Sequence, residues 1–316
     1  MMPRTPHAQR GIALLTAVIL VAIAAVLATA IAFASAMSAR RASTVFGADQ
    51  GLLAAEGAEA MAAYLLTQAG ANHSEDALNQ PWAQSYGPLQ LLPGVMLEYA
   101  QLEDQQGKFN INDLAPDGST SQAAVTQFGQ LLERVGIETK WASLIADWID
   151  ADNQPNFPDG AEDSVYLSQT PAYRPPNLPV TSISELLALP GFGRDRYNRL
   201  LPYIAALPPG TAINTCTAPG VVLDGLSGKT EYSNTGPQQL LAHRQAEGCF
   251  PTTAVFQASL ADQAKTAGGV GVQSTSQYFR LRSVISIGTA RFSLYSLFVR
   301  DGAGQIHVVL RTFGTE

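Results

Sequence analysis

The sequence lacks the motifs that mark the common enzyme classes. It contains no phosphate-binding loop, no G-x-S-x-G nucleophile elbow and no H-E-x-x-H zinc motif. Histidine, the residue most used in acid–base catalysis, is rare and scattered. The four histidines are His7, His73, His243 and His307. We therefore predict a protein that is not an enzyme.

Positive charge is also scarce. The chain has 19 lysines and arginines against 26 aspartates and glutamates, which gives a formal net charge of −7. A nucleic-acid surface needs clustered lysine and arginine, so nucleic acid is not an expected partner of the chain as a whole. The length of 316 residues leaves room for two folded units and an anchor.

Cysteine occurs only twice, as Cys216 and Cys249. In an exported chain an even pair favours a disulfide, and two buried free thiols are the alternative. A bridge would close a loop of about 34 residues and would stabilise the fold by roughly 3–4 kcal/mol, because it restricts the unfolded chain.

Charge is absent from one long N-terminal segment, residues 12–39. A membrane-spanning helix needs about 20 apolar residues, so this segment is long enough to cross a bilayer and to continue past it. Residues 42–69 keep apolar groups at helical spacing, and Gly70 marks the end of the pattern. We predict one long helix whose first part is transmembrane.

Three kinds of targeting segment fit an apolar N-terminus. A secretory signal peptide cleaved between Ala34 and Ala39 would need a shorter apolar core than this one. A plain signal anchor leaves the orientation ambiguous, because basic residues flank the segment on both sides. A prepilin-type leader is short and basic and ends in glycine. The sequence Arg10-Gly11-Ile12 fits this third kind well.

The run QRGIALLTAVILVA resembles a class III prepilin leader, with Gly11 as its last residue and Ile12 as the first mature residue. The resemblance implies cleavage and N-methylation by the prepilin peptidase. Most pilins carry glutamate at the fifth mature position, where it neutralises the N-terminal ammonium of a neighbouring subunit inside the membrane. Thr16 occupies that position here. Members of the general secretion pathway protein K family, the large minor pseudopilins of type II secretion, characteristically lack this glutamate. The sequence resembles that family in this respect.

A hairpin followed by helices is predicted for the middle of the chain. Val95 to Asp104 reads as a strand, residues 105–107 as a turn and Lys108 to Asn112 as a returning strand. Helical spacing then predicts four helices over residues 123–135, 141–149, 183–189 and 197–206. A flexible turn is expected at residues 268–271, followed by strands over residues 278–287, 290–300 and 305–311.

The most distinctive chemical feature is an acidic segment between Lys140 and Arg174 that contains no lysine or arginine. Its acidic residues are Asp147, Asp150, Asp152, Asp159, Glu162 and Asp163. Like charges at this density repel unless they are solvated or bind a cation, and calcium accepts six to eight oxygen ligands in flexible geometry. Pro155 and Ala161 stand where an EF-hand needs glycine and glutamate. A solvated acidic loop is the alternative.

The stretch DWIDADNQPNFPDGAEDSVY resembles the calcium loop of the protein K family. The resemblance implies a structural calcium ion bound by a subset of five residues. These are Asp150, Asp152, Glu162, Asp163 and Asn177.

The stretch ELLALPGFGRDRYNRLLPYI is similar to a helix-hairpin-helix unit with residues 189–193 as the hairpin. Such hairpins can present backbone amides to DNA phosphate, and the alternative is a two-helix packing unit. If the hairpin binds DNA phosphate, the alternative function is that of a tip subunit of a type IV-like pilus with a DNA-binding or surface-binding role.

The family resemblance implies an α+β fold. A pilin-like long N-terminal helix would pack on an antiparallel sheet, with a large inserted α-helical domain containing the helix-hairpin-helix or SAM-like unit. The expected segments are a leader at residues 1–11, a transmembrane helix at 12–39, pilin-like parts at 40–112 and 208–316, and the inserted domain at 113–207.

The implied role is that of a structural subunit at the pseudopilus tip that helps to start assembly and secretion. The implied partners are I-type and J-type minor pseudopilins, the major pseudopilin, the prepilin peptidase and the inner-membrane secretion platform. The expected location is the inner membrane, in a single pass, with the C-terminal bulk in the periplasm.

Overall fold

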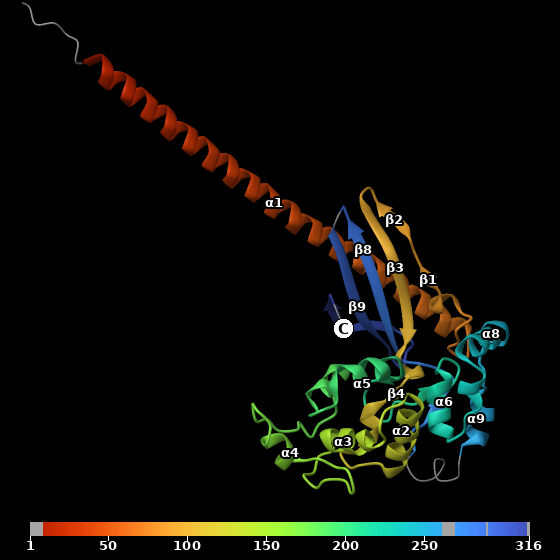
Figure 1. Ribbon diagram of the computed structural model, residues 1–316. Coiled ribbons are helices and arrows are strands. Elements are labelled where there is room, and N and C mark those ends of the chain that lie inside the picture. Colours follow the sequence, from red (N-terminus) through yellow and green to blue (C-terminus); the bar gives the residue numbers. More distant parts are fainter. Residues whose placement is uncertain (1–8, 261–268, 289, 315–316) are drawn as a thin grey trace, which may run out of the picture.

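A computed structural model describes residues 9–260, 269–288 and 290–314. The first element of the described residues is the helix α1 (Gln9–Asn72), which is continuous over 64 residues. Its N-terminal half projects away from the rest of the molecule (Figure 1). The apolar side chains of this half are exposed, for example Ile12, Leu20 and Phe33. By length and composition this segment can cross a membrane.

The C-terminal half of α1 packs on an antiparallel sheet. The sheet has the order β1-β3-β8-β9-β10, and β2 also pairs with β3. Its strands are β1 (Ser85–Tyr86), β2 (Leu89–Leu92), β3 (Val95–Asp104), β8 (Tyr278–Ile287), β9 (Ala290–Arg300) and β10 (Ile306–Phe313). The order joins strands that are far apart in the sequence, because the helical part of the chain lies between β3 and β8.

The first core lies between α1 and this sheet. Small residues on α1, such as Ala55 and Ala62, pack against large side chains such as Phe279 and Phe298. The close approach explains a glycine inside the helix, since a Cβ on Gly51 would lie 2.9 Å from the Phe292 ring. The arrangement is the predicted α+β fold, with one long helix covering one face of the sheet.

A second, largely helical unit lies at the end of the sheet that is farther from the projecting part of α1 (Figure 1). Its helices are α2 (Gln122–Arg134), α3 (Lys140–Ile149), α4 (Asp163–Leu167), α5 (Gly193–Leu200), α6 (Gly220–Ser227), α7 (Glu231–Asn234), α8 (Pro237–Glu247) and α9 (Thr253–Ser259). The described residues also form short 3₁₀ helices. These are η1 (Pro81–Ala83) between α1 and β1, η2 (Gln105–Gly107) after β3, η3 (Ile111–Leu114) before α2, and η4 (Ile183–Ala188) and η5 (Leu201–Tyr203) on either side of α5.

The second core runs through this unit. It contains buried residues from Phe109 to Val270, with Phe128, Ile145 and Phe192 fully buried. Residues of α6 and α9, which lie beyond the predicted domain boundary at residue 207, pack into the same core.

A buried polar network joins the two units. Arg300, at the end of β9, forms an ion pair with Asp76 in the loop after α1, with 2.7 Å between Nη1 and Oδ2. Asp104, at the end of β3, accepts hydrogen bonds from Asn214, Thr217 and Ser276. Burial raises the pKa of Asp104 to about 6. These contacts fix the helical unit to the sheet.

The predicted hairpin at residues 105–112 is wrong. Residues 105–107 form η2, and β4 (Phe109–Asn110) pairs in parallel with β5 (Ile204–Ala205) instead of returning along β3. Asn110 accepts a hydrogen bond from Leu207 N, and Asn112 donates to Leu207 O. These asparagines satisfy backbone groups far along the chain, so the segment turns away from the sheet.

The fourth predicted helix, residues 197–206, is displaced. The helix is α5, which begins at Gly193 and ends at Leu200, and η5 and β5 follow it. Pro202 explains the early end, because it has no backbone N–H to continue the helical hydrogen bonds, although Leu201 before it still has a helical backbone conformation. The predicted turn at 268–271 is followed first by a short strand that was not predicted, β7 (Val272–Gln273), and then by β8 with the expected bounds, and Gly268 lies outside the described residues. The short strands β6 (Ile213–Asn214) and β7 also pair in parallel.

Candidate functional site

The acidic segment folds back on the end of α3 around one buried carboxylate. Asp147 is fully buried and accepts hydrogen bonds from Ala161 N at 2.6 Å, from Asn156 N at 3.2 Å and from the Asn156 side chain. A Cβ on Gly160 would collide with this carboxylate and with the Asn156 backbone. Asp147 therefore closes the loop, and glycine is required at position 160.

The closed loop brings three of the predicted ligands together. Asp150, Asp152 and Glu162 each offer a carboxylate oxygen, and these oxygens lie within 4.8 Å of one another. Thr120 donates a hydrogen bond of 2.7 Å to Asp150 Oδ2 and so orients that carboxylate. Asp150 and Glu162 are buried, whereas Asp152 is exposed.

Several oxygens of this cluster have no hydrogen-bond partner among the described residues. They are Asp150 Oδ1, both carboxylate oxygens of Glu162, and Asn177 Oδ1. Buried polar atoms are normally satisfied, so four unsatisfied oxygens on one loop system need a ligand or water. Burial and the neighbouring carboxylates raise the pKa of Glu162 to about 7, and burial raises the pKa of Asp147 and Asp150. The donor set consists of hard oxygens, which suits calcium and not a soft metal.

The other two predicted ligands, Asn177 and Asp163, differ in their position relative to the three carboxylates. Asn177 donates a hydrogen bond of 2.6 Å to Asp152 O and has a left-handed backbone at φ 49°, so it is held beside the cluster. Asp163 opens α4 and lies 3.3 Å from Arg174 Nη1, where it already has a cationic partner. Asp163 does not belong to the group of three carboxylates.

The supporting roles of Asp147, Thr120, Asn156 and Gly160 in the site were not predicted. One signal was present in the sequence, since Asp147 and Asp150 are three residues apart at the end of a helix and so share a face. The roles of the other three depend on contacts across the loop that no local pattern reveals.

Cys216 and Cys249 are joined by a disulfide. The bridge lies in a small buried cluster with Ala77. It ties the segment after β6 to the segment after α8, beside the segment that follows α1.

The N-terminal residues of the predicted processing site lie within α1. Gly11 and Ile12 are part of the continuous helix, with no break between them. Thr16 donates a hydrogen bond of 3.0 Å to Ala13 O, so its hydroxyl is satisfied inside the helix. The segment therefore offers no carboxylate to a neighbouring N-terminus at this position.

The helix-hairpin-helix segment is largely used for packing. Phe192 is fully buried, and its ring centroid lies 5.0 Å from that of Trp141 on α3. Arg196 forms an ion pair with Glu138 at 2.6 Å, and Arg199 donates to Gly136 O at 2.7 Å. Two of the three arginines of the hairpin are thus tied to the protein itself.

Comparisons with known proteins agree with this architecture. Residues 107–209 match the family model described as "Type II secretion system (T2SS), protein K". The chain is 31% identical to the type II secretion system protein K of Pseudomonas aeruginosa, over 97% of this chain and 93% of that protein. It is 33% identical to the protein K of Klebsiella pneumoniae, over 98% of this chain and 97% of that protein.

A solved structure shows the same fold. In the crystal structure of the GspK-GspI-GspJ complex from the type 2 secretion system of enterotoxigenic Escherichia coli, one chain is similar to this chain, with a TM-score of 0.69 and 27% identity. The similarity covers 87% of this chain and all of that chain. This protein therefore belongs to the type II secretion system protein K family and is a minor pseudopilin.

Proposed function

We propose that this chain is the tip subunit of the pseudopilus and helps to start its assembly. The observation that carries the proposal is the position of the helical unit, at the end of the sheet farther from the projecting half of α1 (Figure 1). A unit of this size at that end obstructs a further subunit stacked above, while α1 remains free to contact subunits below. Thr16 supports the same position, because a subunit at the tip has no neighbour ahead whose N-terminal ammonium needs a carboxylate.

The proposed partners follow from the family. The related E. coli chain is found in a complex with GspI and GspJ. We propose that this chain assembles in the same way with I-type and J-type minor pseudopilins, and through them with the major pseudopilin. Alanine-rich faces of α1 would allow the close approach of helices that membrane assembly requires.

The proposed processing and location complete the role. The prepilin peptidase would cleave between Gly11 and Ile12 and leave α1 in the inner membrane, with the sheet and the helical unit in the periplasm.

No catalytic function is proposed. The packing of the hairpin speaks against the DNA-binding alternative, because Arg196 and Arg199 are already engaged.

We also propose a structural calcium ion, bound by Asp150, Asp152 and Glu162 with Asn177 nearby. The support is the set of unsatisfied oxygens on these residues and their mutual distance. A bound cation would relieve the repulsion that raises the pKa of Glu162 and would fix residues 150–162 against α3.

Deletion of this subunit in its native host is expected to stop secretion of the type II substrates and to reduce the number of assembled pseudopili. The physical reason is that assembly without a starting complex must nucleate from the major subunit alone. Plasmid-borne wild-type chain should restore both. Normal secretion and normal filament numbers in the deletion strain would show that the chain does not start assembly.

A further inference from the structure

Arg244, on α8, is a buried cation that has no carboxylate partner in the described part of the chain. The residue is only 2% exposed. Burial lowers the pKa of its guanidinium to about 10, so the group still carries its charge at neutral pH. A buried charge is costly unless an opposite charge compensates it, and Arg300 meets this need by pairing with Asp76. Arg244 lacks such an anion.

Three hydrogen bonds to backbone carbonyls hold the guanidinium in place. Its Nε donates to Phe250 O at 2.7 Å, and its Nη2 donates to Thr215 O at 2.8 Å and to Ala218 O at 2.7 Å. These carbonyls belong to the two segments that the Cys216–Cys249 disulfide ties together. A guanidinium has five N–H donors, so the two on Nη1 remain, and no atom of the described residues accepts from them.

The Arg244 side chain lines a cavity of about 300 Å³ in the helical unit. Helices α6, α7 and α8 contribute to it together with the segment that follows α1, and Figure 1 shows α8 next to the end of α1. Tyr203 and Tyr232 also line the cavity. Arg244 is its only charged lining residue within the part of the chain that the structure describes. The other walls are mostly apolar and include Leu78, Pro219, Val221, Pro237, Leu240 and Leu241.

Two buried carboxylates contact lining residues of this cavity, but both already accept hydrogen bonds there. Asp104 accepts from Thr217 Oγ1 at 2.6 Å. Asp224 accepts from the backbone N–H of Ser233 at 2.7 Å and from its hydroxyl. Neither carboxylate forms an ion pair with Arg244, so neither supplies the anion that the guanidinium lacks.

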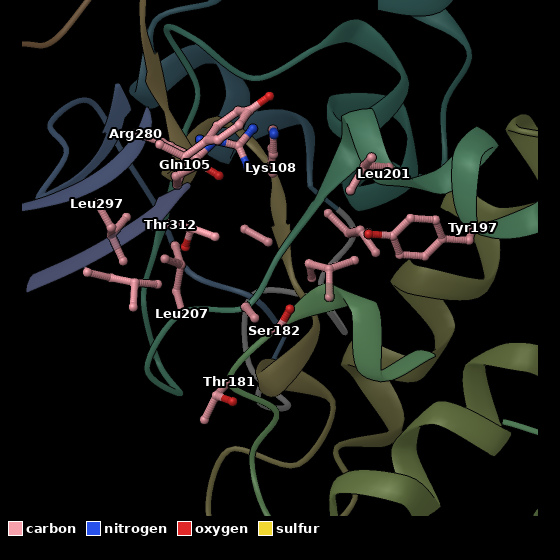
Figure 2. Close-up of a pocket in the computed structure, with 16 residues that line it drawn as sticks. Gln105, Lys108, Thr181, Ser182, Tyr197, Leu201, Leu207, Arg280, Leu297 and Thr312 are labelled. Atoms are coloured by element: carbon pink, nitrogen blue, oxygen red, sulfur yellow. The ribbon is translucent and has the colours of Figure 1, made fainter. Parts of the chain in front are cut away.

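The cleft between the sheet and the helical unit, drawn in Figure 2, differs from this cavity. Its cations are Lys108 and Arg280, and the Glu103 carboxylate lies 3.0 Å from the first and 2.6 Å from the second. Each cation of that cleft thus already has a carboxylate partner. The need for an external anion arises at Arg244.

We propose that the cavity at Arg244 binds a single carboxylate carried by a compact apolar group. The carboxylate would accept from Nη1 and neutralise the guanidinium, while the apolar group would pack against the walls. A phosphate dianion would leave a charge unbalanced in an apolar cavity. Small-molecule sites measure roughly 300–1,000 Å³, so this cavity admits a ligand of about the size of one apolar amino acid. The C-terminal residue of a polypeptide and a free organic acid both have this chemistry.

Calorimetric titration of the purified full-length chain in detergent with N-acetyl-leucine tests this proposal. Two matched compounds each remove one feature of the ligand, since N-acetyl-leucinamide lacks the carboxylate and N-acetyl-glycine lacks the apolar side chain. We expect N-acetyl-leucine to bind, and we expect each matched compound to bind roughly tenfold more weakly or not at all.

Two variants test the place of binding. Arg244→Gln should weaken binding of N-acetyl-leucine by roughly tenfold or more, but it also loses hydrogen bonds to backbone carbonyls and can lower stability. Leu241→Glu is therefore the second variant, because Leu241 lines the cavity and is 42% exposed. Its added carboxylate should repel the ligand and weaken binding by a similar factor. Ala242→Glu is the control, since Ala242 is exposed on the same helix and does not line the cavity, and it should bind as the wild type does.

A short peptide of glycine and serine that ends in leucine with a free carboxylate identifies the source of the ligand. Binding of this peptide together with N-acetyl-leucine would assign the cavity to a polypeptide C-terminus, and binding of N-acetyl-leucine alone would assign it to a free acid. No binding of N-acetyl-leucine, equal binding of its amide, or equal affinities of Leu241→Glu and Ala242→Glu would overturn the proposal. The assembly role is independent of these results, because it is measured in cells through filament number and secretion.

Discussion

Replacing Arg300 with leucine is expected to lower the melting temperature of the chain by roughly 6–20 °C. The side chain of Asp76 is 3% exposed and that of Arg300 is 12% exposed, so the variant leaves a buried carboxylate without its cation. Removing one partner of a buried ion pair costs about 3–5 kcal/mol, and each kcal/mol shifts the melting temperature of a chain this size by roughly 2–4 °C. Arg300 also donates hydrogen bonds to Ser276 O and Leu66 O, which link β9 to the segment before β8 and to α1.

Arg291→Leu provides the matched control on the same strand. Arg291 forms an ion pair with Glu98, but its side chain is 68% exposed. Exposed pairs contribute about 0–1 kcal/mol, so the melting temperature should change by only a few degrees. Both variants are measured as full-length protein in the same detergent. Equal shifts for Arg300→Leu and Arg291→Leu would show that the junction between the two units does not depend on the buried pair.

Calcium is expected to raise the melting temperature of the wild-type chain, and Glu162→Gln is expected to abolish this effect. An ion present at about 100 times its dissociation constant stabilises the folded state by about 2.7 kcal/mol. Without calcium the variant should be more stable than the wild type. The reason is that glutamine removes the ionised form of a buried group whose pKa is raised to about 7 by burial and by neighbouring carboxylates. The measurement is thermal melting at pH 7.5 with calcium or with a chelator.

Asp163→Asn is the control for the calcium experiment. Asp163 is adjacent to Glu162 in the sequence, but its carboxylate pairs with Arg174 outside the group of three carboxylates. This variant should keep most of the calcium-dependent increase in melting temperature. No increase in the wild type, or the same increase in Glu162→Gln, would exclude a calcium site at this position.

The sheet was well predicted because its strands have local signals. The bounds predicted for β3, β8 and β9 are the same as those in the structure. Alternation of apolar and polar residues is a property of the segment itself, since one face of each strand packs on α1. The long helix was also predictable, because its apolar run and its helical spacing are continuous up to Asn72.

The junction between the two units was not predictable in the same way. β4 and β5 are two residues long each and lie about 95 residues apart, so neither carries a pattern of its own. Asn110 and Asn112 decide the path of the chain through hydrogen bonds to residues near 207. A glycine followed by a short apolar run suggested a hairpin, and tertiary contacts overrode that local preference.

The sequence predicted which segment holds the acidic residues of the candidate site, but not how these residues are arranged. The density of carboxylates between Lys140 and Arg174 and the absence of cations there indicated a cation site. The sequence could not show that Asp163 is paired by Arg174, or that Asp147 closes the loop. These assignments depend on the folding of the loop back onto α3, which brings together residues as distant as Thr120 and Glu162.

The intact mass of the membrane-extracted chain, made with and without the prepilin peptidase, tests most directly whether this protein enters the pseudopilus as a processed subunit. We expect a product that begins at Ile12, carries one added methyl group and appears only when the peptidase is present. A product cut between Ala34 and Ala39, or an uncut chain in the presence of the peptidase, would contradict the proposed assembly through α1.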